Sequence, residues 1–454
     1  MGYMLLFLML AFPMVPAVMY AKVAFFGILV VACLFGGLLH KNVWLDARII
    51  ILTVGFAAAG CLFAIRGLLL GTPGATKCAQ IYVFWPLIYS ILLIGASGRK
   101  VLTRLRWVLI AATVFIGIQG TLFALASISV LPANNLARLF SVGWQEQSIG
   151  FHEGYIGIQF PGLNSLPFLI PFVIAALATH RLRDSETGVV RFWLWAALIA
   201  GLAVLVVSSR RGVIVTTLAA PLLTGFLLLF RPAAERRLGI RILARISFVI
   251  VVFAALIIAS FNSVYRFSVT DLAARVFQGF DFSRTTVDEG SLAREEQFTA
   301  LVHGWYEHPI VGAGLGAKAA DSIRSDERPW EYELYYLALL YQTGLLGLLA
   351  YVGGIAWIFW QGVKIIKSDR QKGYLVLPIL VGSACLLLAN ATNPYLPRFD
   401  GLWAIFLPLA HVNSWLVRQK VSASFAATRQ RPTLRLTLLR RDRAKPLSAA
   451  FSRG

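Results

Sequence analysis

Charged residues are scarce in this sequence. Only 14% of its 454 residues are Asp, Glu, Lys or Arg, whereas 58% are hydrophobic, and the mean hydropathy is +0.73. Such a composition excludes an ordinary soluble globular chain. Apolar runs recur from Tyr3 to Val417, each of about 18 to 25 residues, which is the length a helix needs to cross about 30 Å of hydrocarbon. The composition therefore predicts a polytopic integral membrane protein.

Cysteine and histidine are also rare. The four cysteines include no CxxC pair, and three of them lie inside apolar runs without a histidine at ligand spacing, so neither a disulfide framework nor a zinc site is predicted. The acids 288, 289, 295 and 296 are close in sequence but lack DxD spacing and a histidine partner, and we expect no metal. No Walker loop and no GxGxxG precede a soluble helix, so we expect no nucleotide cofactor.

The apolar runs predict an all-α bundle of about twelve transmembrane helices. The first run has no small-residue cleavage site, so we expect it to remain as an anchored span. The expected spans are 3–20, 23–39, 48–70, 79–96, 107–131, 162–179, 192–208, 213–230, 246–262, 334–360, 374–392 and 401–417.

The placement of Lys and Arg predicts the topology. Alternating the connecting segments puts 28 of the 42 basic residues on the side of the C-terminus. The positive-inside rule makes that side cytoplasmic, which predicts an inner-membrane protein with both termini in the cytoplasm. The segments are then 1–262 with nine spans, 263–333 as one large outward (periplasmic) loop, 334–417 with three spans, and 418–454 as a basic tail. Because the basic residues lie beside spans and not on a soluble face, nucleic acid is not an expected partner.

The outward loop 263–333 contains the longest stretch of mixed charge, with twelve acidic residues against seven basic ones. The segments SLAREEQFTALVHGWYEH and AKAADSIRSDE predict two short helices. HPIVGAGLGA, with Pro309, Gly312, Gly314 and Gly316, predicts a turn between them. A second outward loop, 132–161, is mixed polar and aromatic. Loops of this size inside compact proteins are often functional.

Aromatic side chains accompany the charges in the large loop. Trp305, Tyr336 and their neighbours could stack on sugar rings while charged groups bind the hydroxyls; for the aromatics near the span, the alternative is the interfacial belt of the membrane. His308, like His152 and His303, titrates near neutral pH and is a candidate base or glycan contact, with an ordinary structural histidine as the alternative.

Arginines supply the candidate anion site. Arg210 and Arg211 lie in Ser208–Gly212, between two apolar runs, on the side where basic residues are unusual. The planar guanidinium matches phosphate oxygens, so this pair is a candidate pyrophosphate clamp; the alternative is snorkelling to lipid headgroups. Arg66 lies inside a predicted span, which is costly unless it faces a cavity or a partner, and it is a further candidate. Arg138 and Arg398 lie in outward loops and are expected to be solvated loop charges, with a contribution to the same positive field as the alternative.

Several of these features occur in an order that resembles the O-antigen ligase and O-antigen polymerase superfamily. They are the S-S-R-R-G turn, Arg294 before an aromatic-rich helix, H-P-I-V-G-A-G-L-G, and E-L-Y-Y-L-A-L-L-Y-Q-T-G-L-L-G-L-L, which together cover about 207–350. The resemblance implies a metal-independent membrane glycosyltransferase whose outward active site uses a polyprenyl-pyrophosphate-linked glycan. It also implies that Arg211, with Arg210 beside it, and Arg294 bind the pyrophosphate.

One departure from the family pattern concerns the base. Ligases of this family have a His-Asn pair eleven residues before the glycine that Gly344 matches, and this chain has Glu333 and Leu334 there. A glutamate can take a proton from an acceptor hydroxyl, so Glu333 is the expected general base, with Glu331 as a neighbour that can serve instead. The missing histidine favours polymerase over ligase.

The expected function is therefore polymerisation of lipid-linked oligosaccharide repeats into O-antigen or exopolysaccharide. The alternatives are a ligase that transfers glycan to a lipid A-core type acceptor, a transporter or flippase of lipid-linked oligosaccharide, and a non-catalytic assembly protein. Transporters usually show repeats and midplane polar residues, which this sequence has few of. Membrane lipids and other polysaccharide assembly proteins are the expected partners.

Overall fold

The computed structural model describes residues 1–13, 15–39, 45–96, 98–127, 149–152, 155–158, 160–180, 188–208, 210–265, 289–320 and 327–422. Arg138 and the basic tail after 422 lie outside these residues. The regular secondary structure of the described chain is helical except for one short antiparallel hairpin, β1 (Ile149–His152) with β2 (Tyr155–Ile158), inside the second predicted loop.

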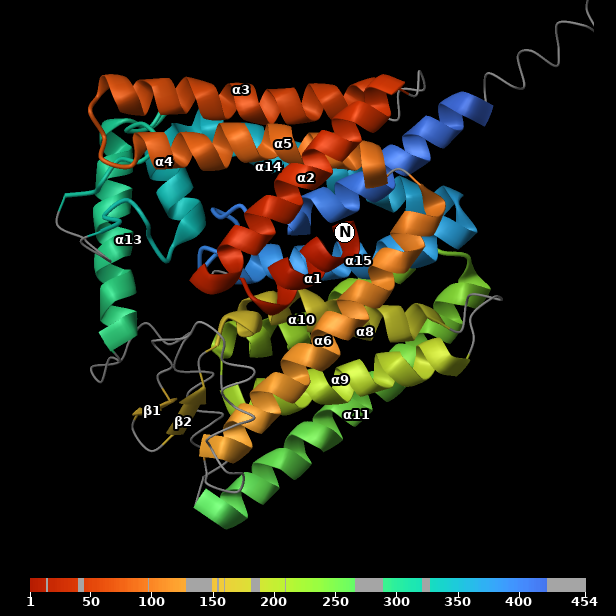
Figure 1. Cartoon of the computed structure of the whole chain (residues 1–454). Coiled ribbons are helices and arrows are strands. Elements are labelled where there is room, and N and C mark those ends of the chain that lie inside the picture. The colour runs from red at the N-terminus through yellow and green to blue at the C-terminus, as the bar shows by residue number, and fades with distance from the viewer. Residues whose placement is uncertain are drawn as a thin grey trace, which may run out of the picture.

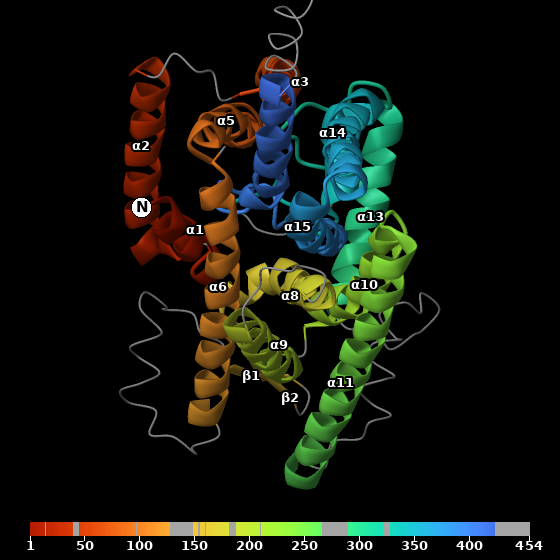
Figure 2. The same ribbon diagram turned by 90° about the vertical axis from the view of Figure 1, so that its right-hand side faces the viewer.

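The helices form a layered bundle with one helix lying across an end (Figures 1 and 2). Their bounds are α1 (Gly2–Ala11), α2 (Pro16–Leu39), α3 (Ala47–Leu69), α4 (Ala75–Ala79), the π-helical turn η1 (Gln80–Phe84), α5 (Trp85–Ala96), α6 (Arg99–Ser127), η2 (Pro161–Ser165), α8 (Leu166–His180), α9 (Gly188–Ser208), α10 (Arg211–Leu228), α11 (Ala233–Tyr265), α13 (Glu289–Glu307), α14 (Tyr335–Ser368) and α15 (Arg370–Ala389), with a further helix at 403–422.

Nine segments of the described chain are long and apolar enough to cross a membrane, in helices α2, α3, α4–α5, α6, η2–α8, α9, α10, α14 and α15. A multi-pass membrane helix bundle is thereby confirmed at this level. The predicted spans 246–262 and 401–417 are also helical, in α11 and in helix 403–422, but they are not among the nine.

The expected boundary between the first two spans is wrong. Helix α1 ends at Ala11 and has only 10 residues, and α2 begins at Pro16 and runs through Lys22 without interruption. Lys22 is fully buried, and its Nζ lies 2.8 Å from Asp400 Oδ2 and donates to Phe12 O at 2.8 Å. A buried charge is costly unless it is paired. The pair therefore explains why a lysine can lie inside an apolar helix.

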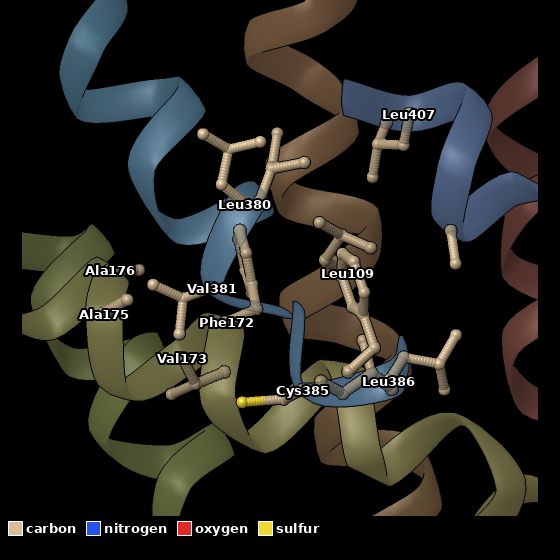
Figure 3. Packing of buried hydrophobic residues seen from close by; sticks show 14 of the residues in the cluster. Leu109, Phe172, Val173, Ala175, Ala176, Leu380, Val381, Cys385, Leu386 and Leu407 are labelled. Carbon is tan, nitrogen blue, oxygen red and sulfur yellow. The ribbon is translucent and has the colours of Figure 1, made fainter. Parts of the chain in front are cut away.

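Helix α8 is the centre of the bundle. Every one of its residues is buried, which explains why the segment is apolar all round and not amphipathic. Figure 3 shows Phe172, Val173 and Ala176 of α8 against Leu380 and Val381 of α15, with Leu109 of α6 beside them. This contiguous core fixes α15, whose two ends lead to the segments described below.

A glycine-rich loop closes a break in helix α14. The helix is interrupted at Gly344, where φ is +64°, and the carbonyls of Tyr341 and Gln342 accept from Ala313 N and Gly314 N at 2.9 Å. In return, Leu345 N and Leu346 N donate to Pro309 O and Ile310 O. Backbone groups inside a membrane protein need such internal partners. The predicted turn at HPIVGAGLGA is confirmed.

The rest of the large loop follows the prediction in part. The first predicted loop helix is α13, whereas 317–320 of the second are not helical and 321–326 lie outside the described residues. Figure 1 shows α13 at the left end of the bundle, across the helix axes, while helix 403–422 finishes at the right. We call these the α13 end and the tail end.

Contacts between distant segments agree with the predicted alternation of the helices. At the α13 end, Arg66 of α3 donates to Gly312 O at 2.8 Å. At the tail end, Asp46 lies 2.8 Å from Lys420, and Lys372 Nζ donates to Ser414 O at 3.3 Å. Each contact joins residues that the charge-based topology puts on one side.

Candidate functional site

One face of α13 holds Glu333 at two points. Residues three apart on a helix share a face, and the two polar residues Arg294 and Gln297 are spaced in this way. Arg294 Nε donates to Glu333 Oε2 at 2.7 Å, and Gln297 Oε1 accepts from Glu333 N at 2.9 Å. The side chains of Arg294 and Glu333 are 37% and 23% exposed. The structure thus brings together a predicted pyrophosphate ligand and the predicted base.

A buried tyrosine fixes the segment that carries both candidate glutamates. Tyr332 is 2% exposed, packs with Leu301 of α13 and Tyr341 of α14, and its hydroxyl accepts from Ala319 N at 2.6 Å. Burial raises the pKa of the Tyr332 phenol, so the ring anchors the segment in its neutral form. Because Tyr332 is anchored between them, Glu331 and Glu333 keep half-exposed positions at the surface of the α13 end.

Glu331 lies between two arginines. Its carboxylate oxygens are 3.4 Å from Arg328 Nη1 and 3.9 Å from Arg398 Nη2. Arg398 belongs to the segment between α15 and helix 403–422, and Asn390 Oδ1 orders this segment by accepting from Tyr395 N and Leu396 N at 2.8 and 2.9 Å. Arg398, expected to be a solvated loop charge, is instead only 22% exposed and near a carboxylate.

Arg210 is held where α10 begins. Its Nη1 donates to Asn164 Oδ1 at 2.7 Å, and its guanidinium also hydrogen-bonds to the hydroxyl of Tyr395. Burial raises the pKa of the Tyr395 hydroxyl and lowers the pKa of Arg210, while their mutual contact opposes both changes. Arginine stays protonated over the physiological range. Arg211 is exposed at the first residue of α10, where the helix N-terminus also favours anions.

The segment 390–400 joins these contacts into one cluster. Tyr395 contacts Arg210, and Arg398 contacts Glu331. Three residues of chain span at most about 11 Å, so the backbone positions of Tyr395 and Arg398 are close and this segment connects the two contacts. We call this set the arginine–glutamate cluster: Arg210, Arg294, Arg328, Arg398, Glu331, Glu333, Asn164 and Tyr395. Its members come from η2, α10, α13 and the segments that flank α14 and α15.

Other predicted residues lie further along the α13 end. Trp305 donates from Nε1 to Pro309 O at 3.1 Å, and His308 is exposed just after α13. At 1.5 Å per residue, these two positions are about 17 to 21 Å along α13 from Arg294. His308 O accepts from Gly312 N, and Gly312 O accepts from Arg66, so Arg66 is at the His308 end of α13 and holds the glycine-rich loop. Arg66 and Arg294 therefore lie near different ends of α13.

Tyr336 has an observed contact between two helices. Its hydroxyl donates to Leu387 O of α15 at 2.6 Å, and its ring lies 5.4 Å from that of Tyr335, whose own hydroxyl is 3.0 Å from that of Tyr82. These contacts tie α14 to α15 and to η1 near the α13 end. A contact of Tyr336 with glycan stays a prediction.

Sequence reasoning missed Arg328 and three further residues whose partners are distant in the chain. Asn164, Gln297 and Tyr395 contact candidate residues that are 36 to 185 positions away in the chain. The available signals were weak: a lone Asn before an apolar helix in GLNSLP, a Gln three positions after Arg294, and an aromatic between two prolines in NPYLP. The role of such a residue can be assigned only when its distant partner is known.

The cluster combines carboxylates with several fixed cations at one end of a membrane bundle. Within the described ranges, no group of His, Cys, Asp and Glu side chains has the arrangement of a metal site. Carboxylates can accept a proton from a hydroxyl, and guanidinium groups can bind the oxygens of a phosphate. The arrangement is therefore suited to chemistry between a hydroxyl and an anionic leaving group. No protein-family model matches the chain, and no curated protein is significantly similar to it.

Proposed function

We propose that this protein is a membrane glycosyltransferase that joins polyprenyl-pyrophosphate-linked oligosaccharides at the outer face of a bacterial inner membrane. The observation that carries the proposal is the 2.7 Å contact of Arg294 with Glu333, inside a cluster that also contains Arg210 and the carboxylate of Glu331. It places a proton acceptor beside fixed cations. Glycosyl transfer from a pyrophosphate donor requires both a proton acceptor and cations that stabilise the leaving group.

The distribution of Lys and Arg supports the proposal that the cluster faces the outer side of the membrane. Lys and Arg concentrate in the connections at the tail end, which the positive-inside rule assigns to the cytoplasm. The arginine–glutamate cluster then faces outward, as does the large loop that contains α13. A multi-pass topology with the tail end inside and the large loop outside is part of this proposal.

The proposed reaction is a displacement at the anomeric carbon of the donor. Glu333 takes the proton of the acceptor hydroxyl, and the oxygen forms a bond to the anomeric carbon. The bond from that carbon to the pyrophosphate oxygen breaks, and the pyrophosphate leaves with the electron pair. Arg210, Arg211 and Arg294 stabilise the charge that develops there. Glu331 is two positions away and can replace Glu333 as the base.

The contact between Arg294 and Glu333 gives the donor a direct effect on the base. A guanidinium has five N–H donors, and the structure shows one of them, Nε, on the carboxylate. A pyrophosphate that binds to Arg294 competes with Glu333 for this cation. Donor binding then weakens the ion pair and leaves the carboxylate available to the acceptor hydroxyl.

Polymerase is preferred to ligase because Glu333 stands where ligases of the resembling family carry histidine. The test uses cells whose own copy is deleted and replaced by wild type, Glu333→Gln or Arg294→Ala at matched membrane levels, with Glu295→Gln as control. Glu295 is exposed on the same helix. Glycan chain length on gels is the readout.

The outcomes separate the candidate functions. Single repeats in the deletion strain, and long chains with wild type and Glu295→Gln only, support the polymerase. Long chains that accumulate on the lipid carrier in the deletion strain indicate a ligase. Normal glycan with both cluster variants refutes catalysis by this cluster, and transport or assembly then explains the protein.

A further inference from the structure

A basic hollow lies at the tail end, opposite the arginine–glutamate cluster. Two adjoining cavities share Leu102 of α6, Leu375 of α15 and His411 of helix 403–422. Arg106 and His180 line the first cavity, and Lys372, Ser414 and Arg418 line the second. We call the two together the tail-end hollow. Four helices, α6, α8, α15 and 403–422, contribute to its walls.

The polar lining of the tail-end hollow is cationic. Among the described residues, it contains one lysine and two arginines and no Asp or Glu. The acids nearby are already engaged: Asp369 accepts from Lys372 N, Asp46 pairs with Lys420, and Glu235 pairs with Arg231 and Arg370. Several positive side chains therefore converge on a space whose walls supply no carboxylate.

Among the described residues, the buried polar atoms of the lining without a hydrogen-bond partner include His411 Nε2 and Ser414 Oγ, in residues that are 4% and 2% exposed. A buried polar atom without a partner is energetically costly and calls for an explanation. Both residues face the same hollow as Lys372, whose Nζ donates to Ser414 O. A ligand with oxygen atoms would satisfy these groups.

The depth of the site points to a ligand at the membrane surface. Arg106 is seven residues inside α6, about 10 Å from its start and directly before the expected span 107–131, which puts its guanidinium at the headgroup level. The apolar walls include Leu102 and Phe172. Cations at the headgroup level above an apolar wall match a phosphate that is attached to acyl chains, and basic pockets between transmembrane helices on the cytoplasmic side bind such headgroups.

We propose that the tail-end hollow binds a phosphate group, carried by an anionic membrane lipid or present as free phosphate. Lys372 and Arg418 supply charge at its mouth, Arg106 supplies charge deeper in, and His411 and Ser414 hydrogen-bond to the phosphate oxygens. The site is separate from glycosyl transfer, and it stands whether or not the transferase proposal holds.

The test uses the purified full chain in neutral detergent. Its thermal unfolding midpoint is measured during titration with dioleoyl phosphatidylglycerol, dioleoyl phosphatidylcholine or inorganic phosphate. The variant is the double substitution Lys372→Gln with Arg418→Gln, chosen because both side chains are half-buried and exposed enough to replace. Arg241→Gln with Arg245→Gln is the matched control, since these arginines are exposed on α11 outside the hollow.

We expect phosphatidylglycerol, but not phosphatidylcholine, to raise the midpoint of wild type saturably. The double variant should need at least about tenfold more phosphatidylglycerol for half of the effect, because charged hydrogen bonds are lost, and the control should stay within about twofold. Protection by phosphatidylglycerol alone supports a lipid ligand; protection by inorganic phosphate as well supports recognition of the phosphate itself.

Native mass spectrometry provides a second readout that does not depend on the stability of the variants. Wild type and the control should retain phosphatidylglycerol, and the double variant should lose it. Equal effects of the two lipids, equal affinity of wild type and the double variant, or equal loss in the control would overturn the proposal.

Discussion

Two arginine–glutamate sites lie at opposite ends of the bundle and differ in how they are used. At the tail end, Arg231 donates to Ile366 O and Arg370 O at 2.6 and 2.8 Å, and its Nε lies 3.2 Å from Glu235. Its guanidinium also stacks on the ring of Tyr374, and its side chain is 2% exposed. At the α13 end, Arg294 is 37% exposed, and its contact among the described residues is with Glu333.

The difference indicates that Arg231 stabilises the fold, whereas Arg294 is available for a functional contact. Arg231 donates to a carbonyl in the last turn of α14 and to one in the first residue of α15, so it joins the α10–α11 turn to the α14–α15 turn and supplies a partner at the end of α14. Arg294 closes no helix end, and half-exposed ion pairs add little stability. A cation that contributes little to the fold but sits beside a carboxylate is available for a ligand.

The largest effect is expected from Arg231→Ala. Removing one partner of a buried charge network leaves Glu235 without that partner and should lower the free energy of unfolding by about 3–5 kcal/mol. Thermal unfolding of the purified chain in detergent measures it, with the exposed neighbour Arg237→Ala as control. A loss below about 1 kcal/mol would show that the two sites do not differ.

The next effect concerns the α13 end and appears in catalysis. Glu333→Gln removes the proposed base and should lower the transfer rate by about 10²- to 10⁴-fold. The free energy of unfolding should change by less than about 1 kcal/mol, because the ion pair is half-exposed. Rates and unfolding are measured on the same preparation. A variant that unfolds easily but keeps its specific rate would make Glu333 structural.

Gly312→Ala tests whether the glycine-rich loop at the α13 end is tightly packed against α14. Gly312 has φ +66°, and an added Cβ would lie 2.5 Å from backbone atoms of Gln342. Strain of this kind should destabilise the protein by about 1–3 kcal/mol. Gly353→Ala on α14 is the control, since nothing lies within 4 Å of its Cβ position. Equal unfolding midpoints of the two variants would contradict the tight loop.

The smallest effect on stability is expected from Arg294→Lys. Lysine keeps the charge near Glu333 but lacks the planar fork that binds two phosphate oxygens. The free energy of unfolding should change by less than about 1 kcal/mol, while the KM for the lipid-linked donor should rise about tenfold. Steady-state kinetics over a range of donor concentrations measures it. An unchanged KM would exclude Arg294 from donor binding.

Local features of this fold were predictable from the sequence. Hydropathy located most helices, and the glycines of HPIVGAGLGA located the loop because positive φ at three of them requires glycine. The helix boundary between Ala11 and Pro16 was missed because Lys22 looked like a span boundary, although Pro13 and Pro16 marked it. Only the fold shows that Asp400, 378 positions away, neutralises this lysine.

The candidate site was predictable as a set of residues but not as an arrangement. Arg294 and Glu333 were assigned separate roles, and their contact depends on how α13 packs against the segment before α14. Arg66 and Arg210 are both arginines near span ends, yet one holds a glycine-rich loop and the other contacts Asn164. Long-range packing decides such differences, and it has no local signal.

The most direct test measures transfer by the purified protein in liposomes supplied with a polyprenyl-pyrophosphate-linked oligosaccharide. Released polyprenyl pyrophosphate and product length are followed for wild type, Glu333→Gln and the control Glu295→Gln. We expect wild type and Glu295→Gln to release the carrier and lengthen the glycan, and Glu333→Gln to do neither at a comparable rate. Equal release by all three, or none by wild type, would contradict glycosyl transfer at the arginine–glutamate cluster.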